Sequence, residues 1–267
     1  MNASAKILVS LDEGIKRITF NRPERRNAID FEMFAQFADA VRESVEDESR
    51  VVVITGAGDS FCAGLDLSAI NPREFASLDV AAKVRELINP PILDLRAMSK
   101  PVVCRVHGPA VGIGFSYALA SDICVASEES SFSQSFVRIG LMPDGGSTYF
   151  LPRLVGPRRA FELMATGEQI GAREAQRLGI VSRVVASAEL DGVVNELAAS
   201  LARGPQPSLA KIKASLGARE AADLAAALDF EAEGQAACFR SPDFVEGVTA
   251  FMQKRPPLFG GASRAAK

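Results

Sequence analysis

Two apolar runs, each followed by a glycine-bearing loop, constrain the fold of this chain more than any other feature. Residues 51–55 lead toward a loop at 60–67, and residues 101–106 lead into a loop at 107–114. Continuous apolar runs of this length are typical of strands that are covered on both faces, as in parallel sheets. After the second loop the pattern becomes helical, which indicates a strand that is followed by a helix.

The segments around these runs contain residues that typically begin, end or interrupt helices and strands. A polar turn containing Gly14 separates two short strand patterns, so a hairpin is expected near the N-terminus. Asp30 is expected to cap a helix with one apolar face. Pro90 and Pro91 are expected to interrupt or kink a helix over 80–98, because proline lacks the N–H that a helix interior needs. The polar stretch at 71–79 is expected to form a flap.

Strand and helix patterns alternate over the rest of the chain up to about residue 190. Helices are predicted at 112–120, 147–155, 157–166 and 172–178, and strands at 123–126 and 181–185. This alternation predicts an α/β fold. We expect a core over residues 1–200 and a C-terminal helical region over residues 201–267.

Composition excludes several classes of function. The 267 residues carry a formal net charge of -3, which argues against a general nucleic-acid surface. A single histidine and four cysteines without a Cys-x-x-Cys pair disfavour a zinc site, and no metal is expected. No signal-peptide core and no run long enough to span a membrane is recognised. We therefore expect a reduced, cytoplasmic protein without a membrane partner.

The two glycine-bearing loops are candidates for an oxyanion hole. Glycine lets a backbone approach a ligand closely, and a helix N-terminus offers unpaired N–H groups. Two such loops side by side could direct two backbone N–H groups at one oxygen and stabilise charge that develops on a carbonyl. Any single glycine here could instead belong to a tight strand-to-helix turn, and for Ala63-Gly64 taken alone the turn is the favoured interpretation.

An ordered set of motifs carries a family resemblance. The motifs are Asn21-Arg22-Pro23, Asn27-Ala28, Phe61-Cys62-Ala63-Gly64-Leu65-Asp66, Lys100-Pro101-Val102-Val103, the loop at 107–114, Ala120-Ser121-Asp122-Ile123, and the turn Gly140-Leu141-Met142-Pro143-Asp144-Gly145-Gly146. Together, from about residue 6 to residue 259, they resemble the enoyl-CoA hydratase/isomerase (crotonase) superfamily. The last turn resembles that of the epoxyphenylacetyl-CoA isomerases of phenylacetate degradation, which also have Δ3,Δ2-enoyl-CoA isomerase activity. The resemblance implies a spiral of β-β-α turns and an acyl-CoA thioester as substrate.

The resemblance also implies where substrate binds. The oxyanion N–H groups fall on Leu65 and Ile113, whose larger side chains would narrow the acyl pocket. One arginine of the cluster Arg22, Arg25 and Arg26 is expected to hold a CoA phosphate, and we take Arg26 as the candidate. Asp66 is expected to shape the first loop and help place the adenine end of the substrate. The remaining candidates for substrate binding are Ala63, Gly64, Leu67, Gly112 and Phe136.

Hydratases of this family use two glutamates, and this chain has neither. The corresponding positions are Ser116 and Phe136, which cannot perform acid–base chemistry on a substrate carbon. Asp144 is the remaining carboxylate with a family precedent, and an apolar pocket around it would raise its pKa toward the range that suits proton transfer. The competing interpretation is that Asp144 only caps the helix that begins near Ser147.

One carboxylate is enough to move a proton between two carbons, so we favour an isomerase that acts on an enoyl or ring-type acyl-CoA, with Asp144 as the proton shuttle. The alternatives are an enoyl-CoA hydratase of fatty-acid or aromatic-acid degradation and a non-catalytic acyl-CoA binder. An acyl-CoA thioesterase that uses Ser116 with His107 is a minor hypothesis, and a structural role is the more common one for such a histidine. No cofactor is expected beyond the coenzyme A of the substrate.

The C-terminal region has an apolar helical face. Leu224, Leu228, Ala232, Ala236 and Phe239 recur at helical spacing, and such a face needs something to pack against. The resemblance implies that the last helices form a trimer interface and help close the substrate pocket. We therefore expect a homotrimer or a dimer of trimers.

Overall fold

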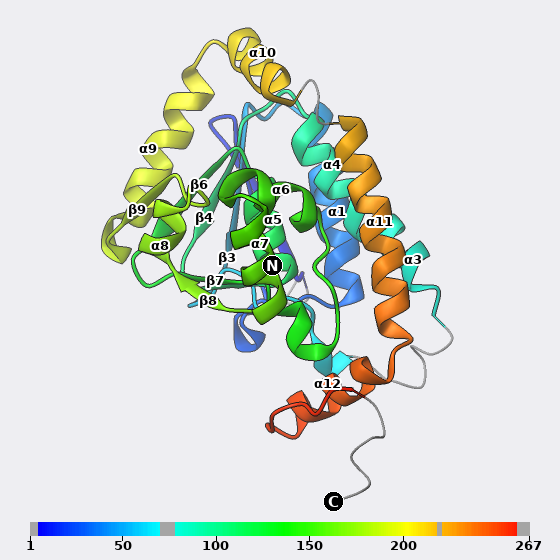
Figure 1. Ribbon diagram of the computed structural model, residues 1–267. Helices are drawn as coiled ribbons and strands as arrows, with labels where there is room; N and C mark the ends of the chain where they lie inside the picture. Colours follow the sequence, from blue (N-terminus) through cyan, green and yellow to red (C-terminus); the bar gives the residue numbers. More distant parts are fainter. Residues whose placement is uncertain (1–4, 70–77, 218–220, 261–267) are drawn as a thin grey trace, which may run out of the picture.

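The computed structural model describes residues 5–69, 78–217 and 221–260 (Figure 1). Within these residues, one sheet has six strands in the order β1-β2-β3-β4-β6-β9. The bounds of these strands are β1 Ile7–Asp12, β2 Ile15–Phe20, β3 Val51–Gly56, β4 Val102–Val106, β6 Ile123–Ser127 and β9 Arg183–Val185. β1 and β2 form the expected antiparallel hairpin, and every later pair in this sheet is parallel.

A second, smaller sheet has three strands in the order β5-β7-β8. Its strands are β5 Pro109–Val111, β7 Ser131–Ser133 and β8 Gln169–Gly171. β5 and β7 are parallel, and β7 and β8 are antiparallel. β5 lies inside the second glycine-bearing loop, so this small sheet fixes that loop from one side.

The helices cover both faces of the larger sheet. They are α1 Phe31–Glu46, α3 Val80–Lys83, α4 Asn89–Ala97, α5 Ile113–Ala120, α6 Ser147–Val155, α7 Pro157–Thr166, α8 Ala172–Arg177, α9 Leu190–Arg203, α10 Gln206–Gly217, α11 Ala221–Phe239 and α12 Pro242–Met252. The single-turn helices are η1 Pro23–Arg25, η2 Leu67–Ala69, η4 Ser135–Ile139 and η5 Ser187–Glu189, and η3 Val84–Ile88 is a π-helix. The predicted alternation of strands and helices is confirmed.

Alternate residues of the central strands face two different cores, because successive side chains of a strand point to opposite faces of the sheet. Val51 and Val53 pack with α9 on one face. Val52 and Ile54 join the larger core on the other face, where α1 and α4 lie. Figure 1 shows α9 on one side of the sheet and α1, α4 and α11 on the other. Asp30 caps α1 as expected, since its side chain accepts a hydrogen bond from the Met33 N–H.

The helix expected over 80–98 is interrupted at its two prolines. Residues 80–83 are α-helical, Val84–Ile88 forms the π-helix η3, and α4 begins at Asn89 with the prolines in its first turn. A proline is tolerated there because the first N–H groups of a helix have no partner within the helix. The prediction of an interruption is confirmed.

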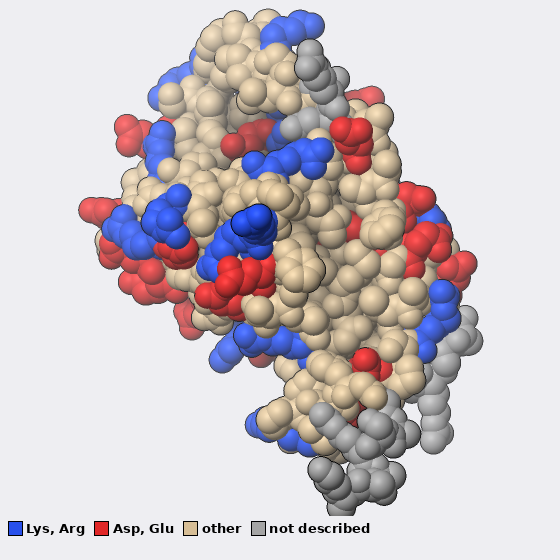
Figure 2. Space-filling model, in the orientation of Figure 1, with Lys and Arg blue, Asp and Glu red and all other residues tan. Residues whose placement is uncertain are grey.

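The apolar face of α11 is buried within the same chain. Leu224 and Leu228 belong to the main core, while Ala232 and Ala236 pack against Val80 and Val84 of α3 and η3. This packing alone accounts for the apolar face, so trimer formation stays a prediction. The flap expected at 71–79 lies almost wholly outside the described residues. No described helix is both long enough and apolar enough to cross a membrane. Figure 2 shows acidic and basic side chains interspersed over one face.

Candidate active site

The two glycine-bearing loops lie side by side and are joined through their backbones. The Cys62 N–H donates to the Pro109 carbonyl at 3.1 Å, and the Val111 N–H donates to the Cys62 carbonyl at 2.9 Å. Gly64 has a φ of +89°, and a methyl group on its Cα would lie 2.9 Å from the Val111 carbonyl oxygen. A side chain at position 64 would therefore push the loops apart, which explains why glycine occupies it.

The close contact of the loops brings two free backbone donors together. Among the described residues, neither the Leu65 N–H nor the Ile113 N–H donates a hydrogen bond. Ile113 is the first residue of α5, so its N–H lies at the positive end of the helix dipole. Both residues line the same cavity. An oxyanion hole needs two such donors at one cavity wall, and that role for Leu65 and Ile113 stays a prediction.

The acidic turn lies against the start of α5. Gly145 has a φ of +65°, and a methyl group on it would lie 2.4 Å from Cδ1 of Ile113. The Ser116 hydroxyl donates to the main-chain carbonyl of Asp144 at 2.8 Å. These two contacts, which come from residues on α5, bring the acidic turn next to Ile113, the residue whose N–H is the second predicted oxyanion donor.

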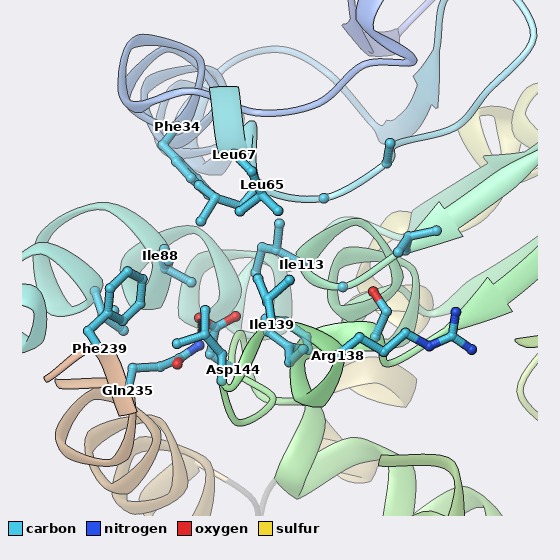
Figure 3. Close-up of a pocket in the computed structure, with 18 of the residues that line it drawn as sticks. Phe34, Leu65, Leu67, Ile88, Ile113, Arg138, Ile139, Asp144, Gln235 and Phe239 are labelled. Carbon is cyan, nitrogen blue, oxygen red and sulfur yellow. Dashed lines mark hydrogen bonds between the residues drawn. The ribbon is translucent and has the colours of Figure 1, made fainter. Parts of the chain in front are cut away.

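A cavity of about 500 Å³ opens between these segments. Its walls are mainly apolar, and Figure 3 shows Asp144 between Gln235 on one side and Ile113 and Ile139 on the other. The apolar lining comes from Phe34, Leu65, Leu67, Val84, Leu87, Ile88, Ile113, Phe136, Ile139, Leu141 and Phe239, among others. Among the described residues, the charged ones of the lining are Arg26, Lys83, Arg138 and Asp144.

Asp144 has the electrostatic properties of a proton-transfer group. Its side chain is 5% exposed, and burial raises its pKa from 3.8 to about 7. A hydrogen bond of 2.7 Å from the Gln235 amide to Oδ2 opposes this rise in pKa, and the nearby Glu231 carboxylate adds to it. Oδ1 of Asp144 is buried and has no hydrogen-bond partner among the described residues. A carboxyl with a pKa near neutrality can both accept and return a proton.

The competing capping role for Asp144 is wrong. The N-cap of α6 is Gly146, and the carboxylate that caps this helix belongs to Glu231 of α11. Glu231 accepts from the Gly146 N–H at 2.7 Å and from the Thr148 N–H at 2.9 Å. The side chain of Asp144 turns instead toward Gln235, because the helix donors are already occupied.

Most predicted substrate-binding residues line the cavity. Among the loop and pocket candidates these are Arg26, Ala63, Gly64, Leu65, Leu67, Gly112, Ile113 and Phe136. Asp66 is not in the described lining, and it binds Arg22 at 2.9 Å and the Ser68 hydroxyl at 2.6 Å. It shapes the first loop as expected, while its contact with substrate stays a prediction. Arg22 is held by its bonds to Ala28 and Asp66. Of the three arginines, Arg26 is the one among the described lining residues of the cavity.

The dyad required by the thioesterase hypothesis is absent from the described residues. Ser116 is fully buried, and its hydroxyl bonds Gly112, Asp144 and Ser147. His107 bonds Arg105 through Nδ1 and the Gly58 carbonyl through Nε2. Burial and the Arg105 charge lower the pKa of His107. Ser116 therefore has no histidine hydrogen-bonded to it, and His107 has the structural role that the sequence favours.

Sequence reasoning missed the two polar residues of α11 that control the acidic turn. Glu231 and Gln235 are buried, and they stand four residues apart within an alanine-rich helix. Two polar residues on the buried side of such a helix were the available signal, because they imply partners in the core. Within the described residues, no group of three His, Cys, Asp or Glu side chains could hold a metal ion.

The fold and the site together define a class of protein, and comparison with known proteins agrees. The sequence profile of the enoyl-CoA hydratase/isomerase family matches residues 10–262, so the chain belongs to that family. Solved structures share the crotonase fold. An enoyl-CoA hydratase from Mycobacterium avium subsp. paratuberculosis K-10 superposes with a TM-score of 0.88 at 36% identity, over 96% of this chain and 99% of that one. The predicted crotonase-like fold is confirmed.

Particular relatives include both isomerases and hydratases. The 1,2-epoxyphenylacetyl-CoA isomerase of Escherichia coli K12 is 38% identical over 96% of this chain and 98% of its own length. A probable enoyl-CoA hydratase of Rhodobacter capsulatus is also 38% identical, again over 96% and 98%. The chain is therefore an acyl-CoA enzyme of the crotonase family, and the names of its relatives do not distinguish isomerisation from hydration.

Proposed function

We propose that this enzyme isomerises an unsaturated acyl-CoA by moving one proton between two carbons. The observation that carries the proposal is the buried carboxyl of Asp144, which lines one apolar cavity together with Leu65 and Ile113, whose backbone N–H groups donate no hydrogen bond among the described residues. A 1,2-epoxyphenylacetyl-CoA isomerase among the relatives supports the same class of reaction.

The chemistry needs no group beyond those in the cavity. Asp144 takes a proton from the carbon next to the thioester carbonyl, and the electron pair moves onto the carbonyl oxygen. The N–H groups of Leu65 and Ile113 stabilise that negative charge, and each such donor contributes on the order of 100- to 1000-fold in rate. The electron pair then returns to form the new double bond, while Asp144 delivers the same proton two carbons away.

The walls of the cavity favour a hydrocarbon acyl group. Phe136 stands where a family hydratase has a glutamate, and Ile113 stands where the glycine triplet has its middle glycine. Both side chains line the cavity and make it narrower and more apolar. We propose a chain or ring without charged substituents as the acyl group, with coenzyme A as part of the substrate, and assembly as a trimer or a dimer of trimers.

Hydration is the second candidate, because relatives named as hydratases match nearly the whole chain. A crotonyl-CoA hydratase of Syntrophomonas wolfei is 36% identical over 96% of this chain. Adding water requires a group that activates it, and the positions of the two hydratase glutamates hold Ser116 and Phe136. Asp144 would have to serve both as the base for water and as the acid for carbon.

Turnover of a 3-enoyl-CoA beside a 2-enoyl-CoA separates the two candidates. We expect rapid conversion of the 3-enoyl substrate, no addition of water to the 2-enoyl substrate, and loss of activity in Asp144→Asn. Water addition that survives in Asp144→Asn would refute the role of Asp144 and favour hydration. Tight CoA binding with no turnover of either substrate would instead indicate a non-catalytic binder.

A further inference from the structure

Gln235 of α11 holds one oxygen of the Asp144 carboxylate and leaves the other free. Its side chain is 1% exposed, and its Nε2–H donates to Oδ2 of Asp144 at 2.7 Å. Oδ1 is buried without a hydrogen-bond partner among the described residues. We propose that Gln235 is the positioning residue of this reaction, which assigns Oδ2 to the protein and Oδ1 to the proton that substrate gives and receives; this inference rests on the isomerase function proposed above.

Hydrogen bonds from α11 to the acidic turn fix the orientation of the Asp144 carboxylate. Residues four apart lie on one face of a helix, so Glu231 and Gln235 approach the turn together. Glu231 binds the main-chain N–H groups of Gly146 and Thr148, while Gln235 binds the side chain of Asp144. One helix therefore fixes both the backbone of the turn and the direction of its carboxylate.

No other donor in the described part of the chain competes for this carboxylate. On α5, the Ser116 hydroxyl reaches the main-chain oxygen of Asp144 and not its carboxylate. The buried Tyr117 hydroxyl has no hydrogen-bond partner among the described residues. Glu231, from α11, is a like charge that raises the pKa of Asp144. Among the residues that the structure describes, the cationic ones of the same cavity are Arg26, Lys83 and Arg138, and no ion pair joins them to Asp144. The Gln235 amide is thus the group that favours the ionised, proton-accepting form.

Replacing the amide by an apolar side chain of similar shape tests this role. In Gln235→Met the pKa of Asp144 should rise by about one to two pH units, as expected for losing a hydrogen bond to a charged group. With the pKa starting near 7, kcat/KM at neutral pH should fall about five- to fifty-fold and recover at alkaline pH. Gln235→Glu keeps the shape and places a second acid beside Oδ2, so its profile should move further in the same direction.

Gln134→Met is the matched control. Gln134 is also 1% exposed, but its amide donates to the Ser147 hydroxyl at 2.8 Å instead of the carboxylate. Gln134→Met therefore also removes a buried hydrogen bond donated by a glutamine amide close to the same turn. It should lower stability while the pKa of Asp144 stays in place.

Infrared titration of the protonated carboxyl band, assigned to Asp144 by its loss in Asp144→Asn, reads this pKa without turnover. A rise in the order wild type, Gln235→Met, Gln235→Glu supports the proposal, and if Gln235→Met does not fold, Gln235→Glu against Gln134→Met decides. An Asp144 pKa that is the same in all variants overturns it. A rise in pKa in an enzyme that does not isomerise any enoyl-CoA would refute the proposed function, while it would still show that Gln235 stabilises the ionised carboxylate of Asp144.

Discussion

The substitution Asp144→Asn is expected to stabilise the protein at alkaline pH while it abolishes activity. In the folded protein burial raises the pKa of Asp144 from 3.8 to about 7. This difference is about 3 pH units, and one unit corresponds to about 1.36 kcal/mol, so ionising the buried carboxyl costs about 4 kcal/mol of stability. Asparagine has the same shape and carries no charge at any pH, so the variant avoids that cost.

The direction of the effect follows from proton linkage. Between the two pKa values the folded protein retains a proton that the unfolded chain has released, so this residue makes the free energy of unfolding fall as pH rises. Its stabilising contribution is complete below pH 3.8 and is lost as pH passes through about 7. Carboxylates such as Asp47, whose pKa its partners lower despite burial, act in the opposite direction. They are present in both proteins and cancel in the difference.

Urea unfolding followed by circular dichroism suits the measurement, because the chain has no tryptophan. Wild type and Asp144→Asn are compared at one protein concentration, at about pH 4 and at about pH 8.5. The variant should gain about 4 kcal/mol relative to wild type between these two conditions. A difference that does not change with pH, or a variant that loses stability at alkaline pH, would refute the assignment of Asp144 as a buried carboxyl with a raised pKa.

Two further substitutions test the parts of the site around Asp144. Gly64→Ala would place a methyl group 2.9 Å from the Val111 carbonyl oxygen at a φ of +89°, so steady-state kinetics should show a kcat lower by on the order of 100-fold. In the control Gly171→Ala the added methyl group has no atom within 4 Å, so this variant should keep its activity. Equal rates for both variants would exclude this loop from the oxyanion hole. Glu231→Gln leaves one buried N–H of the α6 cap without an acceptor and removes a like charge, so chemical denaturation should show a loss of about 1–3 kcal/mol, and the kcat/KM profile should move to lower pH. A shift to higher pH would show that the charge of Glu231 does not act on Asp144.

Much of the fold follows from local patterns in the chain. Apolar runs predicted β3 and β4 because both faces of these strands are buried. The prolines at 90 and 91 predicted an interruption, but not the π-helix that accommodates it, because that depends on how neighbouring helices pack. The strands of the smaller sheet, each three residues long, carry too little periodicity to be predicted.

The site divides in the same way. The backbone donors at Leu65 and Ile113 could be placed from glycine spacing and the family resemblance, since the loops are local features. The bond between Gln235 and Asp144 joins residues 91 positions apart. It depends on how α11 docks against the acidic turn, which no local pattern determines. The capping of α6 by Glu231 was missed for the same reason, and so Asp144 was left with a competing role.

The most direct test of the central claim, that Asp144 carries one proton between two carbons, is to follow that proton. A 3-enoyl-CoA that carries deuterium at C2 is converted by wild type and by Asp144→Asn, and mass spectrometry locates the label in the product. Because Asp144 is 5% exposed and exchange with solvent is therefore restricted, wild type should convert a substrate with deuterium at both C2 positions into a 2-enoyl-CoA with one deuterium at C2 and one at C4, and the variant should give no product. Isomerisation that persists in Asp144→Asn, or a 3-hydroxyacyl-CoA as the product of wild type, would contradict the account.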